Sequence, residues 1–327
     1  MKYAGIDVGY WGLKIATDSG ELILPSCVAP WKKRDVKTEI NRNSDMKLIL
    51  ANLEIGINGQ MYHVGSLANQ GGNRNYEKEK YIPTSDETFS NAKILLLTGL
   101  ALLAKTDYIN PSIVICLPIN DYSSQATKSE KYLPGYYEVV LPYKTVRIKL
   151  ETGKVLAIQE GIAALSSTLL NPDGTQVSKS LYTGKRIGLN DFGWRTDNFF
   201  FMDWTDPDIM DYKDQRSGTV PTGGLSNAFA EFYKRITRTR DITADEAEKI
   251  FLKEGRQEIQ ERIDKNYNHI RMYWPDVSMI DYILFSGGGG QNTYKMWPYP
   301  QEKVVLLPNA IMANALGASY ICRANFS

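Results

Sequence analysis

The sequence repeats one short pattern at two distant places, an Asp-x-Gly turn between two apolar runs. The first turn is Asp7-Val8-Gly9 and the second is Asp191-Phe192-Gly193. The apolar runs on either side predict that each turn joins two antiparallel strands. A glycine at such a tip lets backbone N–H groups approach an anion, and the two carboxylates can hold the waters of one Mg²⁺. The repeat therefore predicts two related halves that bind a polyphosphate between their turns.

A run of four glycines adds to this pattern. Residues 281–284 predict a strand, and Gly287, Gly288, Gly289 and Gly290 follow it closely. Four successive glycines are costly in chain entropy unless the backbone must come close to another group. Together with the two turns, the run predicts that the chain binds a nucleotide.

Composition excludes several classes of protein. At 327 residues, the chain is long enough for about two domains. Its formal net charge of +1 provides no electrostatic footprint for nucleic acid, so we expect no direct nucleic-acid binding. The three cysteines lack CxxC spacing and only two histidines are present, which excludes a typical zinc cluster. The longest apolar run, residues 94–104, is shorter than the roughly 20 residues that a bilayer requires, and no leader signature is present, so we expect a cytoplasmic protein without a membrane segment.

The first domain is predicted to span residues 1–178. It begins with three consecutive strands, and the polar stretch at about 31–91 is predicted to form an inserted subdomain. Within that stretch, Asn58-Gly59 between two apolar runs predicts a β-hairpin, and residues 70–75 predict a mobile loop.

The second domain is predicted to span residues 179–308, with a helical subdomain at about 225–275. Thr243 and Glu246 have the spacing of a capping box, which predicts the start of a helix. Small residues at helical spacing predict a tightly packed last helix at 309–327 that returns to the first domain.

Five motifs in one order resemble the nucleotide site of the actin, DnaK-type chaperone and hexokinase superfamily. They are Asp7-x-Gly9 with Lys14, Gln159-Glu160-Gly161, Asp191-x-Gly193 with Thr196, the glycine run, and residues 308–317. The length, the modest insert and the Gln-Glu-Gly motif resemble the ParM-type actin-like ATPases that segregate plasmids. This resemblance implies an α/β, two-domain actin-like fold, in which each domain is a duplicated ribonuclease-H-like mixed sheet flanked by helices. It also implies ATP and Mg²⁺ in the interdomain cleft, with GTP as the alternative nucleotide.

The resemblance also implies roles for individual residues. Glu160 positions the attacking water, with Gln159 as the alternative, and Asp191 joins them as a catalytic residue. Asp7 and Asp191 hold Mg²⁺ through water. The residues assigned to nucleotide binding are Asp7, Gly9, Tyr10, Trp11, Gly12, Lys14, Gly193, Trp194, Arg195, Thr196, Gly223, Gly224, Glu246, Lys249, Gly287, Gly288, Gly289 and Gly290.

Some of these assignments follow the chemistry of the family, and others depart from its pattern. Lys14 is expected to reach the phosphates, and Glu246 and Lys249 to touch ribose and adenine. The tips Tyr10-Trp11 and Trp194-Arg195 are bulkier than is common in relatives, which predicts different phosphate contacts there.

The function implied is a cytomotive filament for plasmid or DNA segregation, which assembles with ATP and is limited by ATP hydrolysis. Its expected partners are copies of itself and a DNA-bound adaptor protein. The alternative is a non-polymerising small-molecule kinase of the same superfamily. A kinase needs a base aimed at a substrate hydroxyl, and Asp121 is the nearest candidate after the apolar run at 113–117. A protein kinase is excluded because no His-Arg-Asp loop precedes Asp191-Phe192-Gly193.

Overall fold

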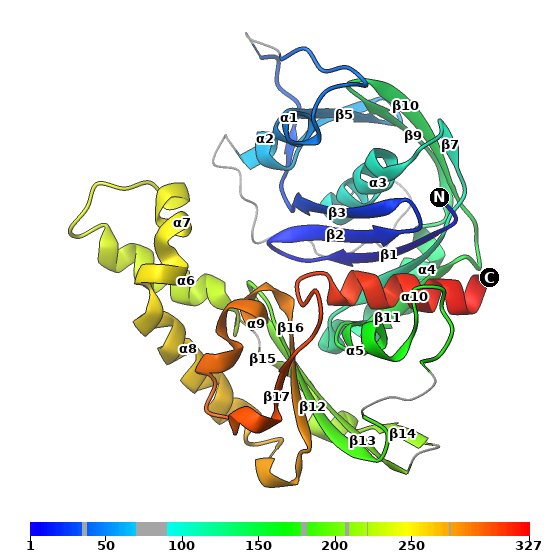
Figure 1. The fold of residues 1–327 in the computed structure, drawn as a ribbon. Helices are drawn as coiled ribbons and strands as arrows, with labels where there is room; N and C mark the ends of the chain where they lie inside the picture. The colour runs from blue at the N-terminus through cyan, green and yellow to red at the C-terminus, as the bar shows by residue number, and fades with distance from the viewer. Residues whose placement is uncertain (35–37, 70–89, 178–181, 207–208, 221, 275) are drawn as a thin grey trace.

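The computed structural model describes residues 1–34, 38–69, 90–177, 182–206, 209–220, 222–274 and 276–327. Three sequence predictions fall outside these residues: the loop at 70–75, the domain boundary at 178–179 and the end of the helical subdomain near 275. The described chain is an α/β structure in which sheets and helices alternate in layers (Figure 1).

Two central sheets have the same strand order. The first contains β1 (Tyr3–Val8), β2 (Gly12–Thr17), β3 (Gly20–Pro25), β8 (Ser112–Leu117) and β11 (Val155–Gln159), in the order β3-β2-β1-β8-β11. The second contains β12 (Lys185–Phe192), β13 (Asp197–Asp206), β14 (Ile209–Tyr212), β16 (Tyr282–Ser286) and β17 (Val304–Leu306), in the order β14-β13-β12-β16-β17, with β15 (Gly218–Val220) paired to β13. In each sheet, three antiparallel strands adjoin two parallel ones. The shared order confirms the duplicated architecture that the two turns predict.

A third sheet lies beside the first central sheet. It contains β4 (Val28–Pro30), β5 (Leu53–Ile57), β6 (Gln60–Val64), β7 (Tyr108–Ile109), β9 (Gly135–Leu141) and β10 (Lys144–Leu150). The hairpin predicted around Asn58-Gly59 is present as β5 and β6. However, β5 also pairs with β9, so the stretch at 31–91 does not form a sheet of its own. A lone two-stranded hairpin is marginally stable in water, and joining a larger sheet stabilises it.

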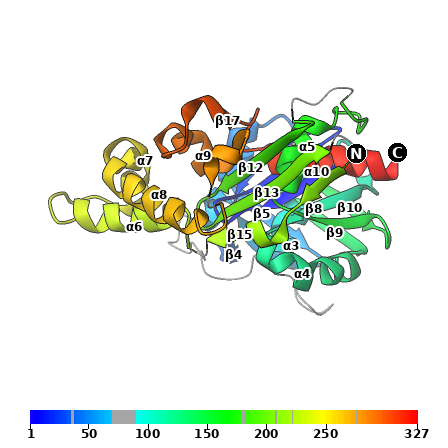
Figure 2. The same ribbon diagram turned by 90° about the horizontal axis from the view of Figure 1, so that it is seen from below.

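Helices separate and cover these sheets. They are α1 (Met46–Ala51), α2 (Ser66–Asn69), α3 (Asn91–Leu103), α4 (Ile119–Tyr132), α5 (Ile162–Leu169), α6 (Leu225–Ile236), α7 (Ala244–Glu254), α8 (Arg256–Ile270), α9 (Gly287–Thr293) and α10 (Ala313–Phe326). α3 lies between the first central sheet and the third sheet, while α5 and α10 lie between the two central sheets (Figures 1 and 2). α6, α7 and α8 pack against the opposite face of the second central sheet. No helix in the described ranges is long and apolar enough to span a membrane.

Local signals fix the helical part of the second half. The capping box predicted at the start of α7 is present, because Thr243 and Glu246 each bond to the backbone N–H of the other. α10 begins at Ala313, later than the predicted start at 309, because residues 308–312 form a turn.

α10 packs closely against α5 and β1, and glycines at the contacts make this possible. A Cβ placed on Gly317 would overlap the carbonyl oxygen of Ala163 in α5. In the same way, a Cβ on Gly5 of β1 would overlap the backbone of α10 at Ala315 and Ser319. The small residues at the end of the chain therefore let two helices and a strand touch through their backbones.

We expect Gly317→Ala to lower the free energy of unfolding by about 1–3 kcal/mol, because the added methyl group has no room. The control is Gly290→Ala in α9, where a Cβ would lie 3.6 Å from the nearest atom and the change of a helical glycine to alanine is expected to stabilise by about 0.5–1 kcal/mol. Chemical denaturation of the two variants checks this. Equal unfolding energies for the two variants would contradict the packing argument.

Candidate functional site

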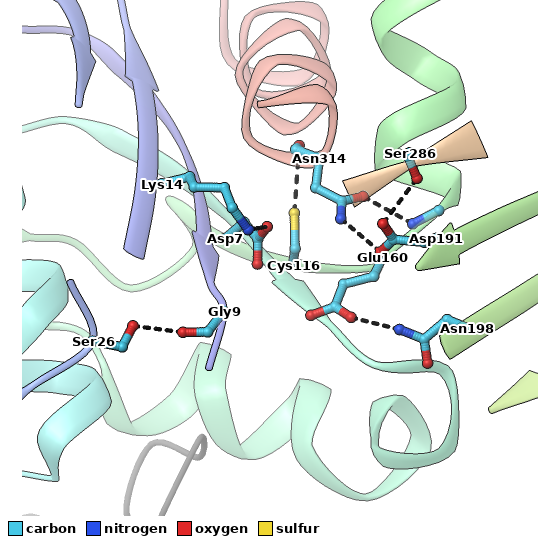
Figure 3. Close-up of polar contacts among 11 residues, drawn as sticks. Asp7, Gly9, Lys14, Ser26, Cys116, Glu160, Asp191, Asn198, Ser286 and Asn314 are labelled. Carbon is cyan, nitrogen blue, oxygen red and sulfur yellow. Dashed lines mark hydrogen bonds and ion pairs between the residues drawn. The ribbon is translucent and has the colours of Figure 1, made fainter. Parts of the chain in front are cut away.

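A cavity of about 620 Å³ lies between the two Asp-x-Gly turns. Asp7 and Gly9 line it from the first turn, and Asp191 and Gly193 line it from the second. α7 and the start of α9 also contribute to the wall. Because both central sheets contribute residues, the cavity lies between the two halves of the molecule. Figure 3 shows polar contacts at and beside the cavity, with Glu160 drawn between the two aspartates.

The cavity brings together most of the predicted site. The predicted residues that line it are Asp7, Gly9, Tyr10, Trp11, Lys14, Glu160, Asp191, Gly193, Trp194, Arg195, Thr196, Lys249, Gly287, Gly288 and Gly289. The predicted residues that do not line it are Gly12, Gln159, Gly223, Gly224, Glu246 and Gly290.

Backbone geometry separates Glu160 from Gln159. Gln159 is the last residue of β11 and pairs with Leu117, so it belongs to the strand and not to the helix that follows. The chain then turns at Gly161, which has φ of 77°, and α5 begins at Ile162. The turn places Glu160 on the cavity wall, while Oε1 of Gln159 is buried with no hydrogen-bond partner in the described part of the chain.

Capping explains why Glu246 lies away from the cavity. Its carboxylate bonds to the backbone and hydroxyl of Thr243, and this bonding lowers its pKa. Glu248, two residues further along α7, lines the cavity instead, beside Lys249. The capping box that the sequence predicts therefore already occupies the Glu246 carboxylate. Nothing in the helical spacing showed that Glu248 would face the cavity.

The glycine run forms the first turn of α9 and is not an open loop. A Cβ on Gly287 would lie 2.6 Å from the carbonyl oxygen of Phe192 and 2.8 Å from Oδ1 of Asp191. A Cβ on Gly289 would also lie 2.6 Å from that carbonyl oxygen. These two glycines let α9 pack against the second turn. Gly288 differs, because it lines the cavity and a Cβ there would meet no atom within 4 Å.

An ion pair occupies the first turn. Lys14 of β2 faces Asp7 of β1 in the strand register, and its Nζ lies 2.8 Å from Oδ2 of Asp7. Burial lowers the pKa of Lys14, but the nearby carboxylates of Asp7, Asp191 and Glu160 together raise it by more, so the net pKa lies above its usual value. The ammonium is thus held charged at the cavity wall, where it suits an anionic ligand.

Asp191 of the second turn accepts hydrogen bonds from two uncharged side chains. The hydroxyl of Ser286 donates to Oδ1 of Asp191 at 2.9 Å, and Nδ2 of Asn314 donates to Oδ2 at 3.0 Å (Figure 3). Burial, and then the charge of Asp7, raise the pKa of Asp191. Asn314 also accepts the backbone N–H of Gly161 at 2.9 Å, so one amide links Asp191 to the turn that carries Glu160.

Asn198 positions Glu160. It faces Asp191 in the register of the second hairpin, which is the place that Lys14 has in the first. Its Nδ2 donates to Oε2 of Glu160 at 2.9 Å, and its Oδ1 accepts from Thr219 at 2.7 Å. The bond from Thr219 fixes the orientation of the amide, so its N–H₂ group points at Glu160.

Sequence reasoning missed several residues of the cavity wall. They are Pro25, Cys27, Ser66, Asn69, Leu225, Glu248, Phe251, Leu252, Asn292, Ile311 and Asn314. Ile311 and Asn314 lie within residues 308–317, a segment that the resemblance assigned to the nucleotide site without naming these two residues. The others come from segments that only the folded chain brings together.

The described part of the cavity wall offers Mg²⁺ too few protein ligands to hold it without phosphate and water. Among the described residues, no group of three or more His, Cys, Asp or Glu side chains is placed to hold a metal ion. Asp7 and Asp191 provide carboxylate oxygens, which are the ligands that Mg²⁺ prefers, from two sides of the cavity. The residues present therefore fit a metal that is bound largely through water and a phosphate ligand.

Comparison with known proteins agrees with this geometry. The sequence profile of the actin-like protein N-terminal domain matches residues 5–162. A ParM protein from Clostridium botulinum, solved as a 15-stranded filament, has a TM-score of 0.78 and 21% identity over 98% of this chain and 99% of that chain. The chain has the actin-like fold.

Other actin-like structures are similar over their whole length. An archaeal actin homologue in complex with ADP has a TM-score of 0.70 and 16% identity, and each chain is covered to 98%. The actin-like protein Alp7A has a TM-score of 0.73 and 14% identity over 99% of this chain and 97% of that chain. No curated protein sequence matches this actin-like chain.

The two aspartates of the site are expected to respond in opposite ways to neutralisation. In the nucleotide-free chain at neutral pH, Asp191→Asn should raise the free energy of unfolding, because the raised pKa of Asp191 means that its charge destabilises the fold. Asp7→Asn should lower it by about 1–3 kcal/mol, because the buried Lys14 loses its charged partner.

Denaturation at several pH values checks both expectations. The gain from Asp191→Asn should shrink as the pH falls through the raised pKa toward the ordinary value of 3.8, where the wild-type carboxyl is protonated in the folded chain. A loss of stability in Asp191→Asn that is as large as in Asp7→Asn would contradict this account of the site.

Proposed function

We propose that this chain is a nucleotide-driven, polymerising actin-like ATPase that forms cytomotive filaments. It binds ATP with Mg²⁺ in the cavity between its two halves and hydrolyses the ATP after assembly. The observation that carries this proposal is the cavity wall, where two Asp-x-Gly turns, the Lys14 ammonium and the Glu160 carboxylate converge. The similar protein solved as a ParM filament and the archaeal homologue solved with ADP support the two parts of the proposal, assembly and nucleotide binding.

Each residue has a defined task in this proposal. The backbone N–H groups of the two turns and the Lys14 ammonium bind the phosphates, and Asp7 and Asp191 hold the metal through its waters. Bound Mg²⁺ neutralises charge on the phosphates. Glu160, held by Asn198, orients the attacking water in line with the terminal phosphate.

The alternative of a small-molecule kinase requires a base aimed at the acceptor hydroxyl, and its candidate in the sequence does not fit that place. Asp121, the nearest candidate in the sequence, lies in the first turn of α4 and does not line the cavity. Asp7 is paired with Lys14, and Asp191 accepts two hydrogen bonds. The filament is therefore the better supported function. Its expected partners are copies of the chain and an adaptor bound to DNA, and its expected task is plasmid or DNA segregation in the cytoplasm.

Light scattering with simultaneous measurement of phosphate release tests this function. Mg²⁺ with ATP or GTP should raise the scattering of the wild-type protein above a critical concentration, and scattering should fall as phosphate accumulates. Glu160→Ala should lower phosphate release by about 100-fold, because the water loses its orienting carboxylate, and should still assemble. Its filaments should therefore outlast those of the wild type.

Two outcomes would contradict the proposal. Flat scattering with steady phosphate release would identify a non-polymerising ATPase or kinase. Normal phosphate release in Glu160→Ala would remove Glu160 from its assigned role. Comparing ATP with GTP also identifies the preferred nucleotide.

Gly288→Ala tests whether nucleotide lies in this cavity. A methyl group there would meet no protein atom within 4 Å but would project into the cavity, so we expect nucleotide affinity to fall about tenfold while the fold stays intact. Titration with a fluorescent ATP analogue measures the affinity.

Gly290→Ala is the matched control, because it adds the same methyl group to the same helix outside the cavity wall. Its affinity should equal that of the wild type. Equal affinities of Gly288→Ala and Gly290→Ala would place the nucleotide elsewhere.

A further inference from the structure

The tip of the first hairpin reaches across the cavity to the second half of the chain. Nε1 of Trp11 donates to Oε1 of Glu248 in α7 at 3.2 Å. The guanidinium of Arg195, at the second tip, lies over the ring of Tyr10 at 4.8 Å from its centroid. Two successive residues of one turn thus contact two separate elements of the other half.

These contacts lie where the cavity opens to solvent. All four side chains line the cavity, and 48% of Trp11 is exposed. About half of the Trp11 side chain is therefore covered, and its indole N–H is directed at Glu248. A ligand that enters or leaves at this opening must pass these side chains.

Both tips are fastened to their own halves. On the first side, Ser26, just after β3, bonds to the carbonyl oxygens of Gly9 and Trp11. On the second side, backbone N–H groups at the start of α6 bond to the carbonyl oxygens of Gly193 and Trp194. Because each tip is held at its base, a contact between the tips restrains the two halves and not just two flexible loops.

We propose that Tyr10 and Trp11 are positioning residues that hold the two halves closed over a bound nucleotide and so set the rate at which the nucleotide leaves. The same turn that offers backbone N–H groups to the phosphates carries both contacts, so phosphate binding and closure act on one short segment. This inference rests on the proposed function, because it concerns the same cavity. We call the pair of contacts, Trp11 with Glu248 and Tyr10 with Arg195, the cross-cavity clasp.

The test is the rate at which a fluorescent ADP analogue leaves the protein in the presence of Mg²⁺, measured by stopped-flow displacement with excess ADP. Trp11→Phe keeps an aromatic ring but removes the indole N–H. We expect the analogue to leave about three to ten times faster, which corresponds to the loss of one exposed charge-assisted contact. Glu248→Ala should have a similar effect, and the double variant should be no faster than the faster single variant, because both changes remove the same contact.

Trp31→Phe is a matched control. Nε1 of Trp31 donates to Oε2 of Glu54 at 3.3 Å, and 36% of Trp31 is exposed. This contact has the same chemistry, but both residues lie in the first half, and neither lines the cavity. The control should release the analogue at the wild-type rate. The clasp would be overturned if Trp11→Phe released the analogue at the same rate as Trp31→Phe. It would also be overturned if the free-energy effects of Trp11→Phe and Glu248→Ala on release added up fully in the double variant.

A second measurement separates failure of the clasp from failure of the proposed function. If the wild type binds no nucleotide analogue, the proposed function fails, and X-ray scattering of the nucleotide-free protein still tests the clasp. We expect the variant with both Tyr10→Ala and Trp11→Ala to have a larger radius of gyration than the wild type and Trp31→Ala. An unchanged radius of gyration would overturn the clasp in that case.

Discussion

The side-chain amide of Asn314 joins parts of the molecule that are distant in sequence. From the start of α10, it accepts the N–H of Gly161 and donates to Asp191, so it links the β11–α5 turn of the first half to β12 of the second. Glu160 lies within that turn, and its place relative to Asp191 depends on this bond. The close packing of α10, which Gly5 and Gly317 permit, brings the amide to that position. A packing constraint at the end of the chain thereby sets the geometry of the cavity.

The fold was predictable because its main signals are local. The two Asp-x-Gly turns, the Asn58-Gly59 turn and the capping box at Thr243 each lie within a few residues, and the structure contains all of them. α9 was not predicted as a helix because glycine disfavours helix on its own. In the folded chain this helix packs closely on Phe192 of the second turn, a contact that no local pattern indicates.

The site was predictable only in part, for a related reason. The turn residues were found because their glycines and aspartates are adjacent in sequence. Asn198 was not found, because it faces Asp191 only through the register of two strands. Glu248 was not found, because it reaches the cavity only through the position of α7 in the folded chain. The distinction between Glu160 and Gln159 needed the backbone turn at Gly161, which no residue pattern specifies.

The two hairpins share their topology but not the residue that faces the aspartate, which is Lys14 in the first and Asn198 in the second. If both carried the same residue, the two duplicated hairpins would offer a charged ligand two similar sets of contacts. An ammonium on one side and an amide that holds a carboxylate on the other remove that equivalence. The duplicated fold thus encloses a cavity whose two sides differ in charge, so a ligand with unlike ends would have one preferred orientation in it.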